Sequence, residues 1–218
     1  MMRGAARFCS TLLVPFALCL LCALAHAAQE SDPAAALLEE AARHSAKTAT
    51  LNADFRQEKK LGVLTQPLTS QGYLCATRGQ SSPAGQRLLW AYVSPAPSGF
   101  LYENGQGALW EKHPAEKRPS NAQEARVVTA IVEHILAWIR IDAKVLQESY
   151  RIERPDKDKP ILLLYPRRQS FFIRLEAEFA PKLDSVRQLT FFEANGDTVR
   201  ILFTDIQINQ PLPERCSR

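Results

Sequence analysis

The side chains able to bind metals are few and scattered in this chain of 218 residues. Beyond residue 27 there are three histidines, His44, His113 and His134, in three separate segments without further ligands at metal-site spacing. Glu133-His134 resembles part of the His-Glu-x-x-His zinc motif, but the second histidine is missing. A packed or solvated helix position explains the pair better. The sequence therefore predicts no metal site and no cofactor.

Motifs of nucleophilic catalysis and of phosphate binding are also missing from the sequence. It contains no Gly-x-Ser-x-Gly turn, no glycine-rich phosphate loop and no local signature of a Cys–His pair. The acidic residues are spread along strand-like segments, where a solvated face accounts for them. A glycosidase-like carboxylate pair stays open, because such pairs meet only in three dimensions. We expect no catalytic residues and a protein that is not an enzyme.

The N-terminus has the three parts of a secretory signal peptide. Arg3 and Arg7 precede an apolar run from Phe8 to Leu24, and Ala25-His26-Ala27 provides a small-x-small cleavage site. A membrane anchor is the weaker reading, since the run is short and a polar segment follows it. We predict a signal peptide over residues 1–27 and a soluble mature protein outside the cytoplasm, without a lipid anchor.

The remaining 191 residues (218 less 27) suffice for one domain, predicted over residues 28–218. Since Arg3 and Arg7 leave with the signal peptide, the formal charge falls from +4 to about +2, with both signs well mixed. The sequence has no prominent block of Lys and Arg. This balance argues against nucleic acid as a partner.

Two cysteines, Cys75 and Cys216, remain in the predicted mature chain. An oxidising compartment allows them to form a disulfide, which would close a long loop. Two unpaired thiols are the alternative, because the sequence cannot place the two Cα atoms close together.

Hydrophobic periodicity predicts helices before and within a long series of strands. Asp32–Lys47 has the pattern of an amphipathic helix capped by Asp32. Ser120–Ile139 is apolar around most of its circumference, which indicates a buried or lid helix. Ten strands are expected at Ala49–Lys60, Pro67–Thr77, Arg87–Val93, Gly99–Glu103, Ala108–Lys112, Val145–Glu153, Ile161–Tyr165, Phe171–Phe179, Leu183–Phe192 and Thr198–Ile208.

These elements define an α+β fold that is mainly antiparallel β. Asn104-Gly105 and Asn195-Gly196 mark tight hairpins. A sheet of about ten strands tends to curl toward a barrel. Several strands are apolar on both faces, which fits either a lipid pocket under the helices or a packed two-layer core. Alternation and helix faces select these candidate pocket residues: Phe55, Leu74, Trp90, Leu101, Trp110, Ile131, Ile135, Trp138, Phe171, Ile173, Phe191 and Phe203.

Four short motifs follow one another along the chain. They are Leu51-Asn52-Ala53-Asp54-Phe55-Arg56-Gln57, Gln71-Gly72-Tyr73-Leu74, Leu88-Leu89-Trp90-Ala91-Tyr92-Val93-Ser94-Pro95, and Asn104-Gly105 before Leu109-Trp110. Their order resembles that in the periplasmic outer-membrane lipoprotein carrier family, LolA and its relatives. The resemblance covers most of the mature chain. It implies an incomplete, half-open β-barrel whose hydrophobic concave face is covered by helices.

The resemblance also implies a function and a lid contact. Family members take acylated cargo from an inner-membrane donor complex and deliver it to an outer-membrane acceptor. Their lid is held by an arginine after the Gln-Gly-x-Leu strand, and Arg78 has the matching spacing. The family's following proline is Gly79 here, and the longer stretch up to Gln86 makes Arg87 a possible substitute. This departure indicates a divergent member.

We therefore expect a monomeric periplasmic carrier that binds the acyl chains of a lipoprotein, lipid or glycolipid. The alternative is a periplasmic sensor or protein-interaction module that uses the same fold without transporting lipid. Binding of a hydrophobic probe would distinguish the two.

Overall fold

The computed structural model describes residues 32–78, 85–115, 123, 129 and 135–217. The chain divides into residues 1–31 and a compact unit, Asp32–Arg218, and the description below concerns this second unit. The predicted signal peptide, residues 1–27, lies outside the described residues. No helix among the described residues combines the length and the apolar character needed to cross a membrane.

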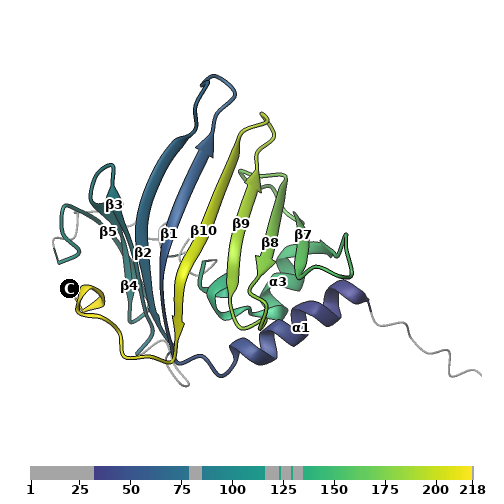
Figure 1. The fold of residues 1–218 in the computed structure, drawn as a ribbon, viewed down its shortest axis with the longest axis horizontal. Helices are drawn as coiled ribbons and strands as arrows, with labels where there is room; N and C mark the ends of the chain where they lie inside the picture. Colours follow the sequence, from purple (N-terminus) through teal and green to yellow (C-terminus); the bar gives the residue numbers. More distant parts are fainter. Residues whose placement is uncertain (1–31, 79–84, 116–122, 124–128, 130–134, 218) are drawn as a thin grey trace, which may run out of the picture. The chain divides into compact units, whose positions relative to one another are not determined.

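The described elements are a long helix, ten strands, a short helix and a terminal turn of 3-10 helix (Figure 1). Their bounds are α1 (Pro33–Ser45), β1 (Thr50–Lys60), β2 (Leu68–Thr77), β3 (Arg87–Ser94), β4 (Ser98–Glu103), β5 (Gln106–Glu111), α3 (Ala143–Ser149), β6 (Tyr150–Glu153), β7 (Ile161–Pro166), β8 (Arg174–Phe179), β9 (Val186–Phe192), β10 (Thr198–Ile208) and η1 (Glu214–Cys216).

All ten strands form one antiparallel sheet in the order β5-β4-β3-β2-β1-β10-β9-β8-β7-β6. Consecutive strands pair with each other except β5 and β6, which lie at opposite edges of the sheet. At the centre, the first strand β1 pairs with β2 and with the last strand β10. Within the described residues β5 and β6 each have one partner, so the sheet stays open. This confirms the predicted fold class and half-open architecture.

The first helix forms where the sequence pattern places it. The Asp32 side chain accepts a hydrogen bond from the Ala34 backbone N–H at 3.0 Å and Pro33 occupies the first turn, both favourable at a helix start. Leu37, Leu38 and Ala41 are buried. Helix α1 therefore packs its apolar side into the core that the sheet shares with it.

The expected strand Val145–Glu153 is wrong in its first half. Asp142 accepts a hydrogen bond from the Val145 backbone N–H at 3.1 Å, which caps helix α3 over Ala143–Ser149. The strand starts only at Tyr150. Residues 123, 129 and 135–140 are helical, in agreement with the expected helix Ser120–Ile139, whose other residues lie outside the described part of the chain.

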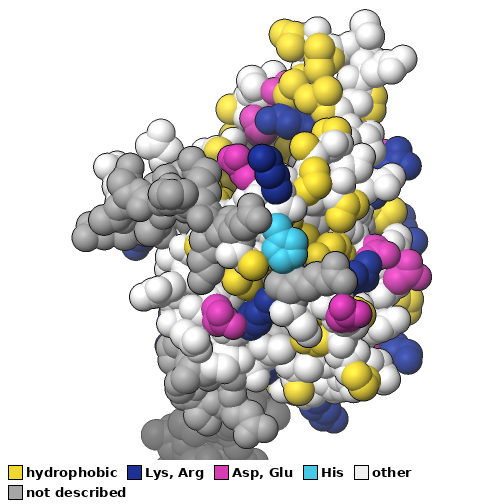
Figure 2. All heavy atoms as spheres, turned by 90° about the vertical axis from the view of Figure 1, so that its left-hand side faces the viewer, with side chains coloured by type: hydrophobic (Ala, Val, Ile, Leu, Met, Phe, Trp, Pro, Cys, Tyr) yellow, Lys and Arg dark blue, Asp and Glu magenta, His cyan; other side chains and the backbone are white. Residues whose placement is uncertain are grey.

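The sheet has two covered faces. The inner face, toward α1 and helical residues 135–140, carries the main core. The outer face carries a smaller cluster, comprising Cys75, Leu89, Ala91, Leu101, Trp110 and Cys216, beneath the C-terminal segment. Large apolar side chains are also exposed beyond the ends of several strands. Figure 2 shows hydrophobic side chains gathered at the top of the view, the end at which Figure 1 places the β1–β2 hairpin.

Candidate functional site

A cavity of about 1250 Å³ lies between the inner face of the sheet and the helices. Strands β1, β2, β3, β4, β9 and β10 contribute one wall, helical residues 135–139 contribute another, and the segment before β8 contributes a third. The apolar lining residues are Leu51, Ala53, Leu74, Trp90, Tyr92, Phe100, Ile135, Trp138, Ile139, Tyr150, Pro166, Phe171, Phe172, Val186, Leu189, Phe191, Val199, Ile201, Phe203 and Ile206. Such a wall suits a long apolar ligand.

An aromatic cluster around Trp90 forms the wall on β1, β3, β4 and β10. The Trp90 ring lies 4.5 Å from Phe55, 5.9 Å from Phe100 and 6.1 Å from Phe203, between ring centroids. The Phe55 ring can lie close to the sheet because its partner on β2 is Gly72. A Cβ at Gly72 would come within 2.5 Å of this ring. The glycine of the Gln-Gly-x-Leu motif thus shapes the cavity wall.

A second aromatic row forms the wall on the other side. Its centroids are 6.1 Å apart for Trp138–Tyr150, 6.3 Å for Tyr150–Phe172, 5.2 Å for Phe172–Phe191 and 4.9 Å for Phe171–Phe172. Phe171 is 72% exposed whereas Phe172 is 4% exposed. The row therefore passes from the buried interior to the surface at Phe171.

Polar groups are concentrated at the opening of the cavity. The exposed lining residues are Glu148, Arg168, Gln169, Ser170 and Phe171. Deeper in the wall, the Tyr92 hydroxyl donates a hydrogen bond of 2.9 Å to Gln57 Oε1, while burial raises the Tyr92 pKa. Burial also raises the pKa of Tyr150 to about 12. Both phenols are neutral at pH 7, so neither places a charge in the deeper part of the wall.

The structure places seven of the twelve predicted pocket residues in the cavity wall: Leu74, Trp90, Ile135, Trp138, Phe171, Phe191 and Phe203. Phe55 belongs to the same face but is buried behind Trp90. Ile131 lies outside the described residues.

Leu101, Trp110 and Ile173 require correction, because they are not part of the cavity lining. Leu101 and Trp110 belong to the outer cluster, and Ile173 is 58% exposed. The inward residues are their neighbours: Phe100 pairs with Leu109, while Leu101 pairs with Ala108. Alternation is ambiguous there since the adjacent residues of each strand are both apolar and both faces of the sheet are covered.

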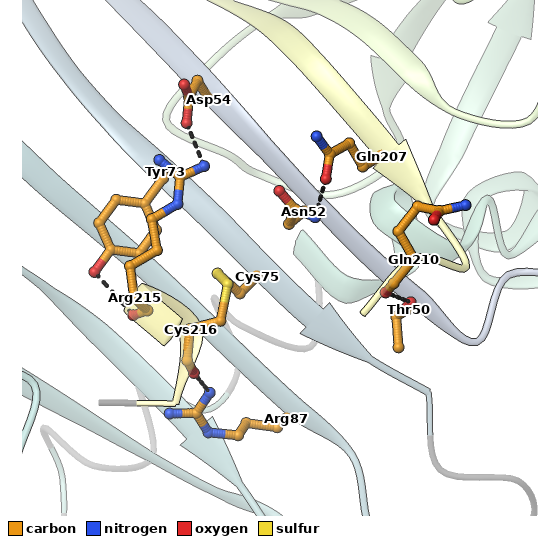
Figure 3. Close-up of a disulfide and its surroundings, with 10 residues drawn as sticks. All are labelled: Thr50, Asn52, Asp54, Tyr73, Cys75, Arg87, Gln207, Gln210, Arg215 and Cys216. Carbon is orange, nitrogen blue, oxygen red and sulfur yellow. Dashed lines mark hydrogen bonds and ion pairs between the residues drawn. A yellow bond between two sulfur atoms is a disulfide. The ribbon is translucent and has the colours of Figure 1, made fainter. Parts of the chain in front are cut away.

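What covers the outer face is the C-terminal segment, held by a disulfide between Cys75 and Cys216 (Figure 3). Arg215 forms an ion pair of 2.6 Å with Asp54 and lies over the Tyr73 ring, 4.7 Å from its centroid. Arg87 donates a hydrogen bond to the Cys216 carbonyl oxygen and pairs with Glu103 at 3.6 Å. Arg87 therefore binds the C-terminal segment on the outer face.

Arg78 instead contacts the ends of two helices. Its guanidinium donates hydrogen bonds to the carbonyl oxygens of Ala46, at 3.0 Å, and Arg140, at 3.4 Å. The Arg140 carbonyl also accepts a hydrogen bond of 2.8 Å from Ser45 Oγ. Cations are favourable at helix C-termini. Arg78 thus joins the end of β2 to α1 and to the helix that forms one cavity wall.

Several lining residues were not among those predicted from the sequence: Tyr92, Phe100, Tyr150, Phe172, Leu189 and Ile206. Tyr92 was recoverable, because it follows Trp90 at the strand period of two. Phe172 was not, since it precedes β8 in an irregular segment where alternation carries no information.

The histidines do not assemble a site. His44 Nδ1 lies 2.5 Å from the Lys182 carbonyl oxygen, and His113 Nδ1 accepts a hydrogen bond from the Ala115 backbone N–H. His134 is outside the described residues. Within the described part of the chain no group of three or more His, Cys, Asp or Glu could hold a metal ion.

The fold and the cavity define a protein with an open antiparallel sheet and an apolar binding chamber. The sequence matches the family of outer membrane lipoprotein carrier protein LolA over residues 46–216. The chain therefore belongs to this family. It matches no curated protein.

Solved structures share the fold at low sequence identity. A structure of MucB is 15% identical, with a TM-score of 0.50, and the match covers 83% of this chain and 60% of that chain. The complex of MucA and MucB from Pseudomonas aeruginosa is matched with 14% identity, a TM-score of 0.45 and coverages of 83% and 59%. Lipoprotein LppX from Mycobacterium tuberculosis is matched with 9% identity, a TM-score of 0.42 and coverages of 84% and 99%.

Proposed function

We propose that the chain is a periplasmic carrier that holds the acyl chains of a lipoprotein or related lipid in the cavity and takes them toward the outer membrane. The observation that carries this proposal is the apolar chamber of about 1250 Å³. This volume exceeds the range of about 300–1,000 Å³ usual for small-molecule sites. Membership of the lipoprotein carrier family supports the same assignment. Residues 1–27 are proposed to be the cleaved signal peptide of this carrier.

The thermodynamic reason for such a chamber is the burial of methylene groups. Each CH₂ taken out of water contributes about 0.8 kcal/mol, so an acyl chain binds without specific polar contacts. An empty chamber exposes its own apolar wall to water. The proposed carrier therefore needs a cover that can be displaced, and residues 135–139 supply part of it through Ile135, Trp138 and Ile139.

The proposal is tested by placing a charge in this cover. Ile135 is half-buried and lines the cavity, so Ile135→Glu brings a carboxylate to an apolar wall. We expect affinity for a fluorescent fatty-acid analogue to fall by at least about tenfold. Ile173→Glu is the matched control, because Ile173 is 58% exposed and does not line the cavity. Equal affinity in both variants would contradict a role for the cover.

A native cargo is identified by mass spectrometry of organic extracts from protein purified without detergent. A stoichiometric acylated molecule would support the carrier and name its cargo. The second candidate is a protein-interaction module. We consider it because the chain shares its fold with MucB, which has been solved in complex with MucA. An extract free of lipid, together with no binding of the fatty-acid analogue, would favour this second candidate.

A further inference from the structure

The β1–β2 hairpin carries apolar side chains that cover nothing in the described protein. Val63 is 90% exposed, Leu64 42% and Leu68 53%. Residues 61–67 connect strands of eleven and ten residues, and β3 pairs only with the part of β2 that begins at Gln71. The hairpin therefore projects beyond its neighbour β3, as Figure 1 shows.

Other exposed apolar side chains lie along the same edge of the sheet. The strand register forms a row from Lys60 through Thr198 and Phe192 to Arg174. Ile173 lies directly beyond this row, since its backbone N–H donates a hydrogen bond of 2.8 Å to the Phe192 carbonyl oxygen.

Phe171 lies at this edge as well, with its ring 6.1 Å from that of Phe191. Val93 is beside the last paired residues of β2 and β3. Six of the seven exposed large hydrophobic residues among those described lie in the hairpin, at the end of β3 or just before β8, and the seventh, Val145, lies on helix α3.

The cavity opens at this edge. Phe171 both lines the cavity and is 72% exposed, and its neighbours Gln169 and Ser170 are exposed lining residues as well. Val199 and Phe191, which pair with each other one position inside the row, line the adjoining wall. An apolar ligand leaving the cavity here would meet the exposed apolar edge before it met water.

The charges of the hairpin specify what the edge fits. Lys59 and Lys60 precede the apolar tip, and the sequence has no acidic residue from Lys59 to Ser70. Neither lysine forms an ion pair within the described residues, whereas Glu58 is neutralised by Arg56 and Arg200. In the adjacent β9–β10 turn are Glu193 and Asp197, and Asp197 accepts a hydrogen bond from the Gly62 backbone N–H. Apolar groups next to two unpaired cations complement an anionic lipid surface.

We propose that this edge is a membrane-docking surface: the tip of the β1–β2 hairpin inserts into the interface of an anionic membrane, and Lys59 and Lys60 contact the head groups. Docking brings the cavity opening to the lipid surface, so that cargo can exchange without crossing water. This inference goes beyond the proposed function, because a carrier could exchange cargo through partner proteins alone.

Flotation of the purified protein with lipid vesicles tests the docking surface. Vesicles of phosphatidylethanolamine and phosphatidylglycerol should bind the protein. The Val63→Ser variant should bind them about tenfold more weakly, because it has lost the apolar side chain that enters the lipid layer. Val145→Ser is the matched control, since Val145 is exposed at α3, and its binding should be unchanged. Absence of binding by the unmodified protein, or equal binding by Val63→Ser, would overturn the proposal.

The charge contribution is measured with Lys59→Gln/Lys60→Gln. This variant should bind phosphatidylglycerol vesicles about tenfold more weakly and neutral phosphatidylcholine vesicles unchanged. An equal loss on both kinds of vesicle would contradict the role given to the lysines.

Binding of the fatty-acid analogue without vesicles separates the docking proposal from the carrier proposal. Val63→Ser should retain this binding. If the unmodified protein binds vesicles but takes up no analogue, the docking proposal is supported and the carrier function is contradicted.

Discussion

Two glycine–aromatic pairs bring large rings close to the sheet, one on each of its faces. Phe55 lies opposite Gly72 on the inner face, and Trp110 lies opposite Gly99 on the outer face. A Cβ at Gly99 would come within 2.8 Å of the Trp110 ring, just as one at Gly72 would meet Phe55. Each glycine therefore makes room for a large ring that would otherwise stand higher above the sheet.

Tyr150 gives a pH-dependence that can be measured. Its pKa is about 12 in the folded protein against about 10 in an unfolded chain, because burial disfavours the phenolate. The phenol contributes its full stabilisation below pH 10 and loses it as the pH rises from about 10 to 12. We expect a decrease of about 2 kcal/mol in the free energy of unfolding over this window, which Tyr150→Phe removes.

Chemical unfolding across this pH range provides the measurement. Tyr165→Phe is the control, since it removes a phenol from β7 outside the cavity wall. An unchanged slope in Tyr150→Phe would show that another group causes the alkaline loss.

Among the elements, Arg78 joins the end of β2 to α1 and to helical residues 135–140. Arg78 donates to carbonyl groups at both helix ends, and the Ser45 hydroxyl joins the same Arg140 carbonyl. Burial and, less strongly, the nearby Arg78 charge lower the Arg140 pKa. The two arginines thus repel each other, and the carbonyl groups that accept from Arg78 offset this repulsion.

Replacement of this side chain tests whether it holds the cavity cover. Arg78→Met removes both hydrogen bonds and should destabilise the junction by about 1–2 kcal/mol. Amide hydrogen exchange of residues 135–140 should then be about tenfold faster, and the exchange rates of the other residues should change less. Arg43→Met, in the last turn of α1 at an exposed position, is the control. Equal exchange in the two variants would argue against Arg78 as a latch.

For the molecule as a whole, the disulfide ties the C-terminal segment to the middle of the sheet. Cys75 and Cys216 are 141 residues apart in sequence, with Cα atoms 5.7 Å apart. Closing so long a loop restricts the unfolded chain, which stabilises the folded one. The segment also shields Leu89, Ala91 and Trp110 from water.

Reduction of this disulfide should therefore lower the free energy of unfolding by about 3–5 kcal/mol. Binding of the fatty-acid analogue should be preserved, because the bond lies on the outer face and the cavity on the inner one. Thermal unfolding with and without reductant provides the measurement. Cys75→Ala/Cys216→Ala is the control and should not respond to reductant. Loss of analogue binding on reduction would mean that the two faces are coupled.

Local sequence signals were enough to predict most of the strand series, the first helix and the family, because strand alternation, turn residues and the Phe55, Gly72 and Trp90 motifs are read over short stretches of chain. The sequence could not show that Phe100 rather than Leu101 faces the cavity. Both faces of β4 are covered, so neither set of alternating residues is polar. The sequence also showed no sign of α3, where a single cap at Asp142 overrides a strand-like pattern.

The pairing of Cys75 with Cys216, the contacts of Arg78 and the shape of the cavity became visible in three dimensions alone. Each depends on groups far apart in the chain: β10 lies beside β1, and the segment before β8 meets β9. The distance between such groups follows from sheet register and packing, and local residue patterns determine neither of them.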